Sequence, residues 1–231
     1  MKIIDKKLRA GIIRFPGSNC DYDALNFFKK YGHESRFIWY KETQMPPEIN
    51  ILVLPGGFAF GDRYYEKATG EYTINPGELA VKSPVMEIVF AAASKKIPIL
   101  GICNGFQILV KSGLLPGKLA RNDSGKFFCD NIACEVLGDS FFKDKEILGK
   151  IFNIPVAHGY GKYIASEPEI FSLETRGHIF LKYKGINPNG SVKNIAGISN
   201  EEGNIFGMMP HPERSPDGKY FIKAMEKYVF G

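Results

Sequence analysis

A single cysteine at the junction of two hydrophobic patterns constrains this chain more than any other feature. Residues 97–102 form an apolar run typical of a buried strand, and residues 106–110 are spaced as on one face of a helix. Between them, Gly101 and Gly105 flank Cys103 and permit a sharp turn and a close approach of another molecule. Backbone N–H groups at the start of a helix also favour a thiolate over a thiol. The stretch predicts a nucleophile elbow, and by itself it leaves a buried structural cysteine as the alternative.

The rest of the first half alternates strand-like with helix-like patterns. Strands are predicted at residues 12–15, 35–40, 51–54 and 97–102, and helices at residues 24–31 and 85–93. Such alternation is typical of a doubly wound α/β fold, so we expect a flavodoxin-like, mostly parallel sheet flanked by helices. With 231 residues, the chain is expected to form one domain over residues 1–231.

The second half is richer in β signals. Extra strands are predicted at residues 127–137, 151–157, 179–183, 195–198 and 205–209, separated by Gly, Asn and Pro turns. A last helix is predicted after Gly218. Residues 64–83 are the least patterned stretch, and we expect a long surface loop there.

Charge and cysteine content argue against several classes of protein. The 30 Lys and Arg exceed the 25 Asp and Glu by five, but they are scattered, so no nucleic-acid partner is expected. The four cysteines lack the CxxC spacing of metal sites, so no metal is expected, and reduced thiols fit a cytoplasmic protein. The sequence has no apolar stretch long enough to cross a bilayer, so no membrane association is expected.

A cysteine nucleophile needs a general base, and His211 has the most suggestive surroundings of the four histidines. It follows an apolar strand in the segment Met-Pro-His-Pro-Glu-Arg at residues 209–214. Pro212 holds the preceding residue extended, and alternation along an extended chain places His211 and Glu213 on the same side. We therefore expect Cys103 as nucleophile, His211 as general acid and base, and Glu213 as the group that orients the imidazole.

Three glycine- or proline-rich loops follow predicted strands, at residues 15–19, 55–62 and 101–105. Ligands of open α/β sheets bind at such loops, so a pocket lined mostly by backbone is expected. The backbone N–H of Asn104 is expected to face a developing oxyanion, with a second donor from Gly56 or Gly57. On local grounds, the Pro-Gly-Gly of this second loop fits an ordinary tight turn equally well.

The remaining histidines have plainer explanations. His158 ends an apolar segment and is followed by Gly159 and Gly161, which permit close backbone approach. Its side chain is expected either as a pocket wall or as a structural residue with its hydrogen bonds satisfied. His33 is expected at a helix C-terminus, and His178 at the surface or at a strand edge.

The motifs resemble a known family. Gly-Ile-Cys-Asn-Gly-Phe-Gln at residues 101–107, with His-Pro-Glu far downstream at 211–213, resembles the class I, or triad, glutamine amidotransferases, whose pattern is Gly-x-Cys-x-Gly-x-Gln with a distant His-x-Glu. More narrowly, the chain is similar to the glutaminase subunits of phosphoribosylformylglycinamidine synthases, and this resemblance covers nearly the whole chain. It rests on Asn104, residues 14–21, 54–58, 61–62, 189–191 and 207–214.

The resemblance implies an activity and partners. Cys103 would form a γ-glutamyl thioester from glutamine, and the ammonia would pass to a separate, large synthetase subunit of purine biosynthesis. Gln107 matches the family position that contacts bound glutamine, and Gly56 and His158 are expected beside it. No cofactor is expected in this chain, because the synthetase subunit binds ATP, Mg²⁺ and formylglycinamide ribonucleotide. A small third subunit commonly helps to join the two.

Three alternatives remain open from the sequence. The chain could be the glutaminase subunit of another amidotransferase, although these usually carry a different residue in place of Asn104. A stand-alone cysteine hydrolase of flavodoxin-like architecture is disfavoured, because such hydrolases place a histidine directly after the nucleophile. A non-catalytic binding module is disfavoured by the intact Cys103, His211 and Glu213.

Overall fold

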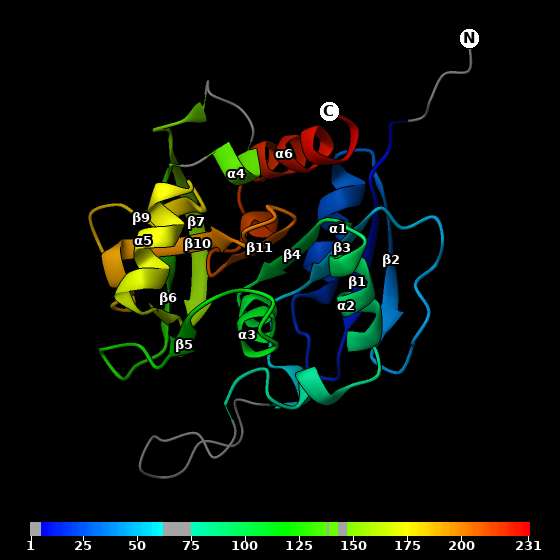
Figure 1. Ribbon diagram of the computed structural model, residues 1–231, viewed down its shortest axis with the longest axis horizontal. Helices are drawn as coiled ribbons and strands as arrows, with labels where there is room; N and C mark the ends of the chain where they lie inside the picture. The colour runs from blue at the N-terminus through cyan, green and yellow to red at the C-terminus, as the bar shows by residue number, and fades with distance from the viewer. Residues whose placement is uncertain (1–5, 62–74, 138, 143–146) are drawn as a thin grey trace.

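The computed structural model describes residues 6–61, 75–137, 139–142 and 147–231 (Figure 1). Its main sheet consists of β1 (Arg9–Arg14), β2 (Glu34–Trp39), β3 (Ile51–Leu54), β4 (Ile99–Ile102), β6 (Phe128–Val136), β7 (Ile151–His158), β9 (Ile179–Tyr183), β10 (Ile195–Ser199) and β11 (Ile205–Met208). The helices are α1 (Asp21–Lys30), α2 (Met86–Ser94), α3 (Asn104–Lys111), α4 (Asp139–Phe142), α5 (Glu167–Thr175) and α6 (Gly218–Phe230). A separate antiparallel pair joins β5 (Lys118–Ala120) to β8 (Lys162–Ile164).

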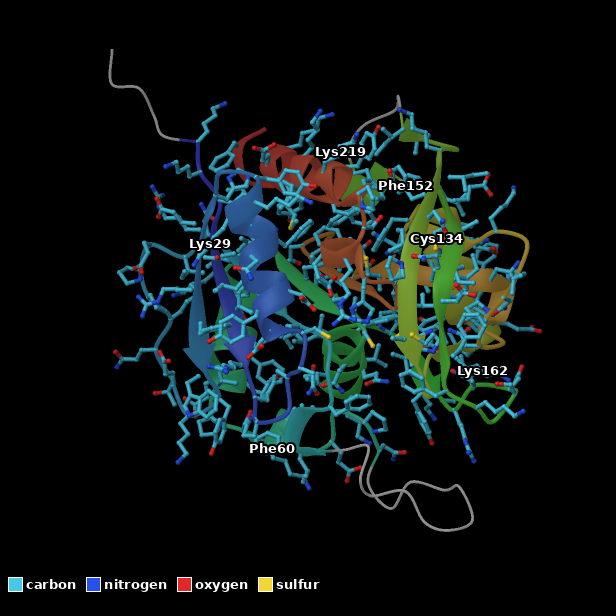
Figure 2. All side chains as sticks on the ribbon, turned by 180° about the vertical axis from the view of Figure 1, so that it is seen from behind. Lys29, Phe60, Cys134, Phe152, Lys162 and Lys219 are labelled. Atoms are coloured by element: carbon cyan, nitrogen blue, oxygen red, sulfur yellow. The ribbon has the colours of Figure 1, made fainter. Side chains whose placement is uncertain are left out.

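The main sheet has a parallel half and an antiparallel half. Its strand order is β2-β1-β3-β4-β11-β10-β9-β6-β7, and the pairings from β2 through β11 are parallel. The pairings from β11 through β7 are antiparallel. The expected doubly wound, parallel core is therefore confirmed, and the extra strands of the second half extend the same sheet. Figure 2 shows the two halves from behind, with Lys29 of α1 over the parallel half and Cys134 in the antiparallel half.

The parallel half is covered by helices, as continuous apolar strands require. All residues of β3 and β4 are buried. The helix α1 packs on β1 and β2, whereas α3 packs on β3, β4 and β11. Strands that are buried on both faces carry apolar residues in succession rather than in alternation, which explains the uninterrupted runs in the sequence.

The pairing of β4 with β11 brings distant parts of the chain together. Gly101 lies opposite Gly207 and Ile102 opposite Met208, and the two strands run in the same direction. The loops that follow them therefore leave the sheet at the same edge, which places Cys103 and His211 near each other.

The remaining differences from expectation are local. Helix α5 is absent from the sequence prediction, although it begins with a full capping box in which Ser166 and Glu169 bond reciprocally. Of the loop expected at residues 64–83, residues 64–74 lie outside the described part of the chain. The described remainder contains the 3₁₀ turn Ala80–Lys82, with Ala80 fully buried. Among the described residues, no helix has the length and apolar character to span a bilayer.

Candidate active site

Cys103 occupies a strained turn between β4 and α3. Its backbone angles are φ 51° and ψ −105°, in a region that costs a non-glycine residue about 1–3 kcal/mol. Its N–H donates to Met208 O at 2.8 Å, which ties the turn to β11. A side chain on Gly105 would collide with Leu54 O, so glycine there lets α3 lie directly on β3. The predicted elbow geometry is present, and it directs the cysteine to the carboxyl edge of the sheet.

The imidazole of His211 forms a buried pair with a carboxylate. His211 Nδ1 lies 2.6 Å from Glu213 Oε1, and the two side chains are 2% and 0% exposed. The expected reason for this pairing was wrong, because Pro212–Arg214 forms a 3₁₀ turn rather than extended chain. The turn still directs both side chains to the same place, and the N–H of His211, bonded to Pro155 O at 2.8 Å, fixes it against β7.

The surroundings of His211 favour its protonated form. Burial alone lowers the pKa of His211, but the Glu213 carboxylate and the charge on Cys103 outweigh burial and hold this pKa well above its usual range. An imidazolium of this kind stabilises a neighbouring thiolate. Its Nε2 has no hydrogen-bond partner among the described residues, so it remains available for proton transfer.

A cavity of about 210 Å³ lies over the cysteine and the histidine. Five predicted site residues line this cavity: Gly57, Cys103, Gln107, His158 and His211. The other three lie directly behind it. Glu213 pairs with His211, Gly56 packs against the His211 ring, and Asn104 begins α3. Further residues line the cavity that were not predicted individually as site residues, although several of them lie in the motifs at residues 14–21, 54–58 and 207–214: Asn19, Cys20, Phe58, Pro76, Phe127, Ala157, Gly159, Tyr160 and Arg214.

The side chain of Asn104 connects three parts of the site. Its Oδ1 accepts from the N–H of Ala59 at 3.0 Å, and its Nδ2 donates to Gln107 Oε1 at 2.8 Å. Gln107 Nε2 in turn donates to Tyr160 O at 2.6 Å. The chain of bonds joins the loop after β3, the first turn of α3 and the loop after β7. The sequence had indicated only the backbone of Asn104, and its buried amide could be found only once these loops were placed.

The Pro-Gly-Gly loop after β3 is built for close approach. Gly57 has φ +136°, and a side chain there would collide with the backbone of residues 17–19. At Gly56, a Cβ would lie 2.6 Å from His211 Cε1. Both positions therefore require glycine in this structure, beyond the needs of an ordinary tight turn.

His158 is a wall of the cavity. It is 3% exposed, and neither ring nitrogen has a hydrogen-bond partner among the described residues, which excludes the alternative of a satisfied structural residue. Burial and the nearby charge of His211 lower its pKa from the usual 6.5 to about 4. His158 is therefore neutral at physiological pH.

We predict that His158 makes the protein sensitive to mild acid. A histidine whose folded pKa is lowered binds its proton more readily in the unfolded chain, so between pH 6.5 and about 4 the free energy of unfolding falls as the pH falls. The full loss is about 3 kcal/mol. Urea titrations of the wild type and His158→Asn at pH 7 and pH 4 should show a larger loss for the wild type by about this amount. Equal losses would mean that His158 titrates normally.

The loop that carries His158 is held by Asn122. The Asn122 side chain donates to His158 O at 2.9 Å and accepts from Gly161 N at 3.0 Å, and its own N–H donates to Gly159 O at 2.9 Å. Asn122 is 3% exposed and lies outside every motif that the sequence suggested. It satisfies three backbone groups of one pocket wall.

The sequence resemblance implies glutamine as the substrate, and on that basis we predict that Asn122→Asp raises the KM for glutamine about tenfold with a smaller effect on kcat, because a carboxylate cannot donate to His158 O. Initial rates over a range of glutamine concentrations measure both constants. The control is the reaction of the complete complex with added ammonium in place of glutamine, which bypasses this cavity and should be unchanged. A fall in kcat at constant KM would contradict a role in shaping the pocket.

Comparison with known proteins agrees with this fold. The profile of the CobB/CobQ-like glutamine amidotransferase domain matches residues 7–225. The subunit PurQ of phosphoribosylformylglycinamidine synthase from a Nostoc species is 40% identical, with 96% of this chain and 99% of that protein covered. PurQ from Wolinella succinogenes is also 40% identical, over 88% of this chain and 89% of that protein.

Solved structures give the same answer. A chain in the structure of PurLQS from Thermotoga maritima matches with a TM-score of 0.83 and 34% identity, over 96% of this chain and 99% of that one. A glutamine amidotransferase from the same organism shares the fold, with a TM-score of 0.58 and 18% identity over 96% of this chain and 84% of that one. Fold and site define the class as that of the glutamine amidotransferases. Within that class, the chain belongs to the family of the PurQ subunits of phosphoribosylformylglycinamidine synthase.

Proposed function

We propose that this chain is the glutaminase subunit of a phosphoribosylformylglycinamidine synthase. It hydrolyses glutamine to glutamate and ammonia, and the ammonia is used by an ATP-dependent synthetase subunit to convert formylglycinamide ribonucleotide to formylglycinamidine ribonucleotide in purine (IMP) biosynthesis. The observation that carries the proposal is the buried His211–Glu213 pair beside Cys103, in a chain of the PurQ family. Because the parallel and antiparallel halves of the main sheet form one continuous nine-stranded sheet, we infer that residues 1–231 act as one amidotransferase domain.

The first half of the reaction forms a thioester. His211 holds the proton of the Cys103 thiol, and the thiolate attacks the side-chain amide carbon of glutamine. We assign the backbone N–H groups of Asn104 and Gly57 to the negative oxygen of the tetrahedral intermediate. As the C–N bond breaks, His211 gives its proton to the leaving nitrogen, which departs as ammonia.

The second half of the reaction regenerates the enzyme. Water enters beside His211, which takes a proton from it, and the resulting hydroxide attacks the thioester carbon. The C–S bond breaks, glutamate leaves, and the proton returns to Cys103. Glu213 holds His211 in one orientation and stabilises its positive charge in both halves.

Glutamine recognition falls to the walls of the cavity. We assign Gln107, His158 and the backbone at Gly56 to contacts with the substrate, since they surround Cys103. His158 is neutral, so it contributes a hydrogen bond and shape rather than charge.

The partners follow from the family. The matched Thermotoga maritima structure is of PurLQS, so for this chain too we infer a small third subunit together with a large synthetase subunit. ATP, Mg²⁺ and the ribonucleotide belong to the synthetase, and we propose no cofactor, nucleic acid or membrane partner for this chain. We place the complex in the cytoplasm.

Release of ammonia from glutamine tests the proposal. We expect low turnover for the isolated chain and a marked rise on addition of the synthetase and third subunits, ATP and formylglycinamide ribonucleotide. A chain without an acceptor site gains nothing by releasing ammonia into water, which is why coupling is expected. Equal turnover with and without the partners would contradict coupling, and no turnover under any condition would contradict the glutaminase itself.

A further inference from the structure

A second thiol lies beside the His211–Glu213 pair. Cys20 precedes α1, is 5% exposed, and faces the same cavity as Cys103 and His211. Its N–H donates to Gly56 O at 3.2 Å, which fixes it against the Pro-Gly-Gly loop. The reaction above uses only one thiol, so Cys20 is a buried nucleophilic group without a role.

Three kinds of metal ligand meet at this thiol. Cys20, His211 and Glu213 each offer one ligand atom, and these three atoms lie within 4.8 Å of one another. Ligand atoms around a tetrahedral Zn²⁺ are separated by about 3.5 Å, so modest side-chain movements would bring all three to an ion. Sulfur, imidazole nitrogen and carboxylate oxygen are also the donors that Zn²⁺ prefers.

One buried atom of this group lacks a hydrogen bond. Glu213 Oε2 has no partner among the described residues, and the Glu213 side chain is fully buried. A buried polar atom without a partner costs free energy, and binding to a cation removes that cost.

The cavity gives access to the ring and the sulfur. Because Cys20 and His211 both line the cavity, an ion can reach them by the route that substrate takes.

The sulfur of Cys20 has a charged neighbour. Arg214 Nη2 lies 3.1 Å from Cys20 Sγ. Arg214 is itself paired with Asp23 through two bonds of 2.8 and 2.6 Å, which reduces its repulsion of an incoming cation.

We propose that Cys20, His211 and Glu213 form an inhibitory site for Zn²⁺ and similar soft divalent cations. On binding, the Cys20 thiol and the His211 imidazolium each lose a proton to solvent, and the ring nitrogen freed in this way gives its lone pair to the ion. That imidazole can then no longer carry protons for Cys103, so glutamine hydrolysis stops until the ion is removed. The inhibition rests on the proposed glutaminase function, whereas the binding site does not.

Metal binding is tested first with Co²⁺ as a spectroscopic probe on the full chain. Thiolate ligation gives a near-ultraviolet charge-transfer band, and we expect one Co²⁺ bound per chain in the wild type. The band should persist in Cys103→Ala and in Cys129→Ser, which removes the exposed thiol, and should be lost in Cys20→Ser. Thermal melting confirms that each variant is folded. A band that survives Cys20→Ser, or that disappears with Cys103 or Cys129, would overturn the proposal.

Inhibition is tested second, with Zn²⁺ added to the complete complex. We expect Zn²⁺ to stop the glutamine-dependent reaction, a chelator to restore it, and the ammonium-dependent reaction to continue. Relative to its own zinc-free rate, Cys20→Ser should require at least about tenfold more Zn²⁺. Equal sensitivity of Cys20→Ser and wild type would overturn the proposed inhibition. Co²⁺ binding can be measured without turnover. If only the glutaminase assay fails, the Co²⁺ titration therefore still tests the proposed metal site.

Discussion

Replacing Cys103 by serine is expected to lower glutamine-dependent turnover by about four orders of magnitude or more. In the proposed reaction the Cys103 sulfur is the nucleophile, and a serine hydroxyl is far harder to ionise than a thiol. Serine fits the same space at the strained turn, so the fold and the cavity should be retained. Initial rates of ammonia release by the complete complex measure the effect.

Two controls distinguish loss of the chemical step from loss of the folded structure in this experiment. The complex with Cys103→Ser should make product from added ammonium at the wild-type rate, and Cys134→Ser removes a different buried thiol. A Cys103→Ser enzyme with more than a tenth of the wild-type glutamine rate would contradict the assignment of the nucleophile.

Replacing Glu213 by glutamine is expected to lower kcat by about four orders of magnitude, with little change in KM. The neutral amide has nearly the same shape, but it cannot stabilise an imidazolium and can donate to Nδ1, which favours the wrong tautomer of His211. Since Glu213 helps to hold the pKa of His211 well above its usual range, the variant should also lower the pKa of His211. Rates across a range of pH measure both effects.

The chain contains a matched control for this substitution. His33 Nε2 lies 3.2 Å from Glu226 Oε1, which is another histidine–carboxylate pair, on the far end of α1 and remote from the cavity. Glu226→Gln likewise replaces a carboxylate beside a histidine by a neutral amide, and it should leave turnover unchanged. Equal losses of turnover in Glu213→Gln and Glu226→Gln would show that a loss of folding stability, and not of catalysis, lowers the rate.

The elbow could be predicted because its signals are local. An apolar strand, two glycines and an amphipathic helix follow one another within residues 97–110. Together these consecutive signals predict a sharp turn between the strand and the helix. The adjacency of β4 and β11 could not be predicted in this way. It depends on a sheet order that joins strands about a hundred residues apart. His211 was connected with Cys103 from its local sequence context and from the family resemblance, and neither of these gives the position of the two strands in the sheet.

The supporting residues were the hardest to predict. Asn122 and the amide of Asn104 act through backbone groups of loops that are distant in sequence, so no spacing or periodicity marks them. The pairing of His211 with Glu213 was predicted from an extended chain, and it is instead produced by a 3₁₀ turn. Helix α5, in contrast, carried a readable signal in Ser166 and Glu169 that outweighs its weak hydrophobic periodicity.

The central claim is that Cys103 and His211 release ammonia from glutamine for direct use by a partner subunit. Its most direct test supplies the complete complex with glutamine that is isotopically labelled at the amide nitrogen, together with a large excess of unlabelled ammonium at low pH, where free ammonia is scarce. Mass spectrometry of the formylglycinamidine product then measures the origin of its new nitrogen. We expect a product that carries the label almost completely, and loss of that label with Cys103→Ser. A product whose label is diluted to the level of the bulk ammonium would contradict it.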